Sequence, residues 1–179
     1  MSDKHNFAYM YSCAAGKAPS AKQLEAVKEE YLSLLPSELA ALKKNKKYKA
    51  ASGVEKFIKT LLSFPDVKLA LATGNVEEAA KIKLAPAGLD KYFVTGGFGW
   101  DGAERTELLK AAVKRASKTF KHKFTPDEVY VIGDTHLDVV AAKENGYHSA
   151  VVKEAGLADK ERLLRAAAEA EVETFKDEE

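Results

Sequence analysis

The chain of 179 residues has few of the features that mark nucleic-acid-binding, membrane or disulfide-rich proteins. Its single cysteine, Cys13, excludes an internal disulfide and favours a reducing compartment, which we expect to be the cytoplasm. Its 28 basic and 27 acidic residues nearly cancel, so no overall field attracts nucleic acid or a membrane surface. The apolar run over residues 7–15 is too short for a membrane span and unlike a signal peptide. These absences predict a soluble protein whose partners are neither nucleic acid nor membrane.

Strand and helix patterns alternate along most of the chain. Apolar residues recur at helical spacing over residues 20–35, 54–62, 76–87, 106–119, 139–145 and 158–168. Short apolar runs between turn residues predict strands over residues 67–72, 92–94, 129–132, 149–152 and 171–175. This alternation predicts an α/β fold with a mostly parallel sheet.

Local signals set several of the helix ends. Ser20 with Gln23 and Ser52 with Glu55 form capping-box patterns, which satisfy the first amide groups of a helix. Pro36 should interrupt the first of these helices, because proline has no amide hydrogen to donate.

Two carboxylates follow the predicted strand over residues 129–132. Asp134 comes directly after Gly133, and Asp138 lies one helical turn further on. Ligands of open α/β sheets gather at the carboxyl ends of the strands, and carboxylate oxygens suit Mg²⁺. The pair therefore predicts a Mg²⁺ site, although an aspartate in the first helical turn can also serve simply as a cap.

A second set of polar residues follows the predicted strand over residues 67–72. The hydroxyl of Thr73 and the turn at Gly74 and Asn75 could bind phosphate oxygens, helped by the N-terminus of the next helix. Lys83 or Lys81 on that helix could reach back to a phosphate, or remain a solvated surface charge.

These motifs resemble the haloacid dehalogenase superfamily, in its phosphoglycolate phosphatase-like branch. Leu71 to Asn75 resembles the family's second motif, in which the threonine binds the phosphoryl group. Lys83 best matches the lysine of the third motif, with Lys81 as the fallback, and Gly133 to Asp138 resembles the fourth motif, whose acidic residues hold Mg²⁺. Residues 92–105 also resemble this branch, and Trp100 and Arg105 either line a substrate entrance or serve packing and surface ion pairs.

The first motif of the family is missing. It is a strand ending in Asp-x-Asp-Gly-Thr, which supplies the nucleophile and the general acid and base, and this chain contains no Asp-x-Asp. Alignment of the apolar run at residues 7–17 on Gly16 places Cys13 and Ala15 at the two aspartate positions. Asp3 lies before this run and cannot take either position. The resemblance therefore implies a three-layer Rossmann-like core whose first strand and most of whose cap are missing or replaced. We expect residues 7–12 either to fill the place of that central strand or to be disordered.

The resemblance divides the chain into three parts and leaves two functions open. Residues 1–19 form a divergent or disordered segment, residues 20–50 a remnant of the helical cap, and residues 51–179 the core. The implied activity is Mg²⁺-dependent hydrolysis of a small phosphorylated metabolite, by a protein that could form homo-oligomers and whose first motif is missing here through truncation or an incorrect start. The alternative is a non-catalytic relative that binds phosphate and Mg²⁺, because no residue matches the aspartate that attacks phosphorus.

Overall fold

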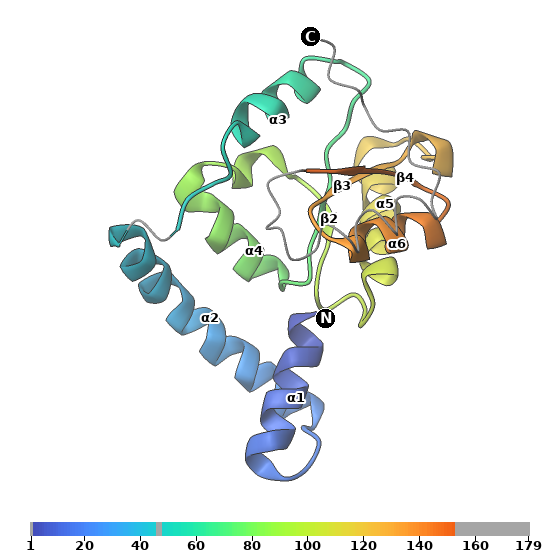
Figure 1. Cartoon of the computed structure of the whole chain (residues 1–179). Coiled ribbons are helices and arrows are strands. Elements are labelled where there is room, and N and C mark those ends of the chain that lie inside the picture. The colour runs from blue at the N-terminus through green and yellow to red at the C-terminus, as the bar shows by residue number, and fades with distance from the viewer. Residues whose placement is uncertain (1, 46–47, 153–179) are drawn as a thin grey trace. The chain divides into compact units, whose positions relative to one another are not determined.

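The computed structural model describes residues 2–45 and 48–152, which belong to two compact units divided between His122 and Lys123 (Figure 1). The predicted helix at residues 158–168 and strand at residues 171–175 lie outside the described residues.

The first unit contains the elements up to residue 122. In chain order these are α1 (Asp3–Ala15), α2 (Ala21–Lys44), α3 (Val54–Leu62), β1 (Leu71–Ala72), α4 (Glu77–Leu84), the 3₁₀ turns η1 (Ala85–Ala87) and η2 (Asp90–Tyr92), β2 (Gly96–Gly97) and α5 (Arg105–Phe120). The described part of the second unit contains the 3₁₀ turn η3 (Pro126–Glu128), β3 (Tyr130–Gly133), α6 (His136–Glu144) and β4 (His148–Val151).

Each unit contains one pair of parallel strands. β1 pairs with β2 in the register Leu71 to Gly96, and β3 pairs with β4 in the register Tyr130 to His148. Within the described residues, β1 is bonded only to β2 and β3 only to β4. The predicted α/β class with parallel strands is confirmed. Strands bonded along a single edge are also consistent with a core that has lost its first strand.

The helices of the first unit share an apolar core. Its buried members come from α1, α2, α4 and the residue before α4, and they are Phe7, Leu35, Leu39, Val76 and Ala79. Half-buried side chains such as Tyr31 and Trp100 pack around this cluster. The core thus fixes α1 and α2 against the segment that follows β1.

Residues 7–12 lie in helix α1, so both expectations for this segment were wrong. Phe7 is buried against Tyr31, with 5.1 Å between the ring centroids. Gly16 ends the helix in the left-handed conformation, with φ of 68°. Packing of Phe7, the one buried residue within Asp3–Ala15, against Tyr31 of α2 helps to stabilise a helix here, whereas a strand would have needed neighbours to pair with.

Helix α2 continues through Pro36 to Lys44, which the sequence did not predict. The side chain of Pro36 is exposed, and Leu35 and Leu39 are buried on either side of it. Burial of two leucines offsets the helix-breaking cost of about 3 kcal/mol. In the described part of the chain, neither α2 nor another helix is long and apolar enough to cross a membrane.

The capping predictions had mixed outcomes. The box at Ser20 is confirmed, since the Ser20 amide donates to Oε1 of Gln23 over 2.9 Å and the Gln23 amide donates back to Oγ of Ser20 over 3.3 Å. The capping box predicted at Ser52 is wrong, because Gly53 is the residue that precedes α3. Gly53 has the left-handed backbone conformation, and no side chain caps the helix. The predicted helices α3, α5 and α6 are nevertheless present within a few residues of their expected ends.

The strand predictions were accurate in the second unit and poor in the first. β3 and β4 lie within one residue of their predicted ranges, but only Leu71 and Ala72 of residues 67–72 are paired. The strand predicted at residues 92–94 was wrong: η2 occupies residues 90–92, and the paired residues are Gly96 and Gly97. A Cβ atom on Gly97 would lie 1.9 Å from the Leu108 carbonyl oxygen of α5, so close backbone packing selects glycine over the usual strand residues.

Candidate functional site

The predicted phosphate-binding residues form one tight turn between β1 and α4. Oγ1 of Thr73 accepts hydrogen bonds from the Asn75 backbone amide, over 3.1 Å, and from Nδ2 of Asn75, over 2.9 Å. The Thr73 amide donates to the Gly97 carbonyl over 3.0 Å, which anchors the turn to β2. We call residues 73–76 the β1–α4 turn. It brings a hydroxyl, an amide side chain and the N-terminus of a helix to one place.

Lys83 reaches this turn, whereas Lys81 does not. Nζ of Lys83 donates to Oδ1 of Asn75 and lies 5.7 Å from the centre of the Tyr31 ring. Nζ of Lys81 instead pairs with Oε1 of Glu77 on the exposed side of α4, at 2.7 Å. Two residues of separation turn the side chains to different faces of a helix. The geometry therefore favours Lys83 over its fallback as the cation beside the turn.

Asp3 also contacts the β1–α4 turn, which no sequence pattern predicted. Its backbone amide donates to the Gly74 carbonyl over 2.7 Å, and its Oδ2 accepts from the Val76 amide over 3.0 Å. Asp3 thus places a carboxylate at the N-terminus of α4, where a negative charge is favoured. Seventy-three positions separate Asp3 from Val76, so no local pattern could have revealed the contact.

The segment after β2 packs directly on the same turn. The Gly99 amide donates to the Asn75 carbonyl over 2.7 Å. A Cβ atom on Gly99 would lie 1.9 Å from the Gly74 carbonyl oxygen, so only glycine permits this approach. We call residues 96–101 the Gly96–Asp101 loop.

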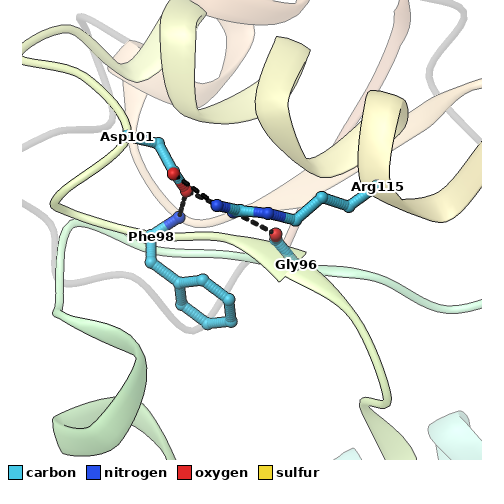
Figure 2. A network of polar contacts seen from close by, with 4 residues as sticks. All are labelled: Gly96, Phe98, Asp101 and Arg115. Atoms are coloured by element: carbon cyan, nitrogen blue, oxygen red, sulfur yellow. Dashed lines mark hydrogen bonds and ion pairs between the residues drawn. The ribbon is translucent and has the colours of Figure 1, made fainter. Parts of the chain in front are cut away.

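An ion pair joins the two ends of this loop to α5 (Figure 2). Both guanidinium nitrogens of Arg115 contact the Asp101 carboxylate, with Nη2 at 2.6 Å from Oδ1. Nη1 also donates to the Gly96 carbonyl over 2.9 Å, and the Phe98 amide donates to Oδ2 of Asp101 over 2.7 Å. Burial alone would raise the pKa of Asp101, but hydrogen bonds from Arg115 and from the Phe98 amide outweigh it and leave that pKa below its ordinary value. Sequence patterns gave no signal for this pair, because its members lie 14 positions apart.

Trp100 serves packing in the first unit. Its ring lies 6.1 Å from that of Phe7, between centroids, and Nζ of Lys28 lies 5.4 Å from the Trp100 ring. Arg105 is the first residue of α5. Their proposed place at a substrate entrance stays a prediction.

The predicted metal ligands lie in the second unit, at the end of β3. Oδ2 of Asp138 accepts from the Thr135 amide over 3.1 Å and from Oγ1 of Thr135 over 2.9 Å, which makes it the capping-box residue of α6. Asp138 is buried and lies against Gly133, whereas Asp134 is exposed. The simpler role of helix cap therefore holds for Asp138, and metal binding by the pair stays a prediction.

The described residues contain no cluster of three or more histidine, cysteine, aspartate or glutamate side chains arranged to hold a metal ion. Cys13 and Ala15, which the alignment on Gly16 placed at the aspartate positions, lie in the last turn of α1. That alignment is wrong in structural terms, because Gly16 ends a helix and does not follow a strand. The exposed thiol of Cys13 thus has no place in the site at the β1–α4 turn.

Residues 14–146 match the family described as haloacid dehalogenase-like hydrolases. The chain belongs to this family. The matched range includes the β1–α4 turn, Lys83 and both candidate metal ligands, and it begins at the end of α1.

A solved haloacid dehalogenase-like hydrolase from Streptococcus pneumoniae has a similar fold, with a TM-score of 0.55 and 17% sequence identity. The likeness covers 92% of this chain and 84% of that one. No curated protein matches the sequence. The family and the fold are therefore established.

Proposed function

We propose that this protein is a Mg²⁺-dependent phosphomonoester hydrolase of the phosphoglycolate phosphatase-like branch. The observation that carries the proposal is the convergence of Thr73, Asn75 and Lys83 at the carboxyl end of β1. Membership of a hydrolase family supports it. Its substrate would be a small phosphorylated metabolite, and it would act in the cytoplasm.

Each residue of the cluster has a distinct role in this proposal. The Thr73 hydroxyl hydrogen and the Gly74 amide would bind phosphoryl oxygens, and Asn75, which bonds both Thr73 and Lys83, would hold these groups in place. Lys83, already directed at the turn by Asn75, would neutralise part of the negative charge on the phosphoryl group. Tyr48 donates its hydroxyl hydrogen to the Lys83 carbonyl over 2.7 Å and thereby helps to fix the end of α4.

Asp134 and Asp138 are the residues that would hold Mg²⁺. Carboxylate oxygens together with water are the ligands that this ion prefers, so the donor chemistry fits. When bound, the ion would supply positive charge that can polarise an oxygen ligand. The exposed side chain of Asp134 suits an ion that retains part of its hydration shell.

The missing Asp-x-Asp motif favours a second candidate, a non-catalytic protein that binds phosphate and Mg²⁺. Hydrolysis by the family route begins with attack of a carboxylate on phosphorus, and no residue of the chain matches that nucleophile. Strands β1 and β3, each bonded along one edge within the described residues, would also leave room for a partner such as a second copy of the chain.

Phosphate release from 2-phosphoglycolate and p-nitrophenyl phosphate, with Mg²⁺ or with EDTA, separates the two candidates. A hydrolase should release phosphate only with Mg²⁺, and Asp134→Asn and Lys83→Met should each lower kcat/KM by about 100-fold. Lys81→Met is the matched control on the same helix and should retain wild-type activity, because Lys81 pairs with Glu77 on the exposed face.

Absence of turnover contradicts the hydrolase proposal. If the chain then still binds inorganic phosphate, and Lys83→Met but not Lys81→Met weakens that binding, the non-catalytic candidate holds. Absence of both turnover and phosphate binding rejects both candidates.

A further inference from the structure

We propose that Asp101 and Arg115 are positioning residues for the β1–α4 turn. Their ion pair fixes the Gly96–Asp101 loop, and this loop holds the backbone of Gly74 and Asn75 in the phosphate-binding conformation. The inference rests on the proposed phosphate site, but the contacts between loop and turn exist without any ligand.

The pair acts on both ends of the loop at once. Arg115 reaches from α5 to the Gly96 carbonyl at the start of the loop and to the Asp101 carboxylate at its end (Figure 2). Asp101 in turn accepts from the Phe98 amide in the middle of the loop. A planar guanidinium that bonds a carboxylate through two nitrogens restricts orientation as well as distance.

The pair differs from an ordinary surface ion pair in its surroundings. The side chain of Arg115 is 45% exposed and that of Asp101 17%, but the loop residues Gly96 to Phe98 that the pair bonds are buried. Removal of either partner would leave a buried carbonyl or amide without its hydrogen bond, which costs more than the loss of an exposed pair.

The loop transmits this constraint to the turn through glycine contacts. Gly97 packs against the Leu108 backbone of α5, and Gly99 packs against the Gly74 backbone, with no space for a Cβ atom at either position. The hydrogen bond from the Gly99 amide to the Asn75 carbonyl joins the loop to the turn. Because the Gly99 backbone is in direct contact with the backbone of Gly74 and Asn75, a shift of the loop must move these two residues.

Inorganic phosphate is the probe for the test, titrated into the isotope-labelled full chain while the amide resonances of Gly74, Asn75 and Val76 are followed. The variants are Asp101→Ala, Arg115→Met and the conservative Arg115→Lys. Lys59→Met is the matched control, since it removes an exposed ion pair with Glu55 on α3, at 2.9 Å. Hydrogen exchange at the Gly99 amide, without ligand, is measured in parallel for each variant that retains a folded spectrum.

We expect Asp101→Ala and Arg115→Met each to weaken phosphate binding by about 10-fold and to speed exchange at Gly99 by a similar factor. Arg115→Lys should fall between them and the wild type, because lysine keeps the charge but not the two-nitrogen geometry. Lys59→Met should change neither quantity. Phosphate affinity within twofold of wild type in both Asp101→Ala and Arg115→Met overturns the proposal.

If the wild-type chain shows no response to phosphate, the proposed phosphate site is contradicted. The positioning role is then tested by hydrogen exchange at the Gly99 amide without phosphate. In that case faster exchange at Gly99 in Asp101→Ala supports the positioning role. Unchanged exchange there overturns it.

Discussion

Single residues of the β1–α4 turn show how far sequence patterns can identify a site. Thr73, Gly74 and Asn75 follow an apolar run, and they do form a hydrogen-bonded turn before a helix. Lys83 could be preferred over Lys81 only through a family motif, whereas the structure separates them by the faces of α4 on which they lie. Asp3, Asp101 and Arg115 could not be found, because contacts between distant positions leave no local pattern.

The carboxylate of Asp3 should stabilise the first unit. Replacement by asparagine removes the charge at the N-terminus of α4 and weakens acceptance from the Val76 amide, so we expect a loss of about 1 kcal/mol in unfolding free energy. Urea unfolding followed by Trp100 fluorescence measures this loss. The exposed control Asp66→Asn should leave the free energy of unfolding unchanged. Equal values for Asp3→Asn and the wild type would show that the contact contributes nothing.

The lowered pKa of Asp101 predicts a pH window for its contribution to stability. A carboxyl group whose pKa is lower in the folded chain stabilises it above the unfolded pKa, about 4, and loses that effect as the pH falls through the folded value. The difference in unfolding free energy between wild type and Asp101→Asn should therefore be constant from about pH 5 to 7 and shrink below about pH 4. A difference that varies between pH 5 and 7 would assign the effect to another group.

At the scale of elements, helices with a regular apolar stripe were predicted well and short paired segments poorly. Helix α5 buries Leu108, Leu109, Ala112 and Ala116 on one face, and this periodicity was sufficient to place it. Strand β2 consists of two glycines, and a Cβ atom on Gly97 would collide with the backbone of α5. Glycine has low strand propensity, so propensity could not locate this strand. Helix α1 buries only Phe7, and its apolar run resembled a strand.

Pro36 provides a test of helix α2. Its exposed ring lies inside a continuous helix, where proline costs about 3 kcal/mol relative to alanine. We therefore expect Pro36→Ala to raise the unfolding free energy of the first unit by about 1 to 3 kcal/mol, as measured by urea unfolding. Ser37→Ala, at the exposed neighbouring position, should change it much less. Destabilisation by Pro36→Ala would indicate that the helix does not continue through this residue.

For the whole molecule, the sequence predicted the α/β class and the family, and the comparisons confirm both. The motifs at Thr73 and Asp134 were sufficient because each directly follows a strand, in the order that the family motifs have. Helix α1 could not be predicted in the same way, since its ring partners Tyr31 and Trp100 lie elsewhere in the chain.

We propose that the β1–α4 turn and Lys83 bind a phosphoryl group. Titration of the full chain with inorganic phosphate, followed at individual backbone amides, tests it most directly. We predict saturable shifts at Gly74, Asn75 and Val76 that Thr73→Val and Lys83→Met weaken by about 10-fold and Lys81→Met does not. Shifts confined to other residues, or equal affinities in all three variants, would contradict the account.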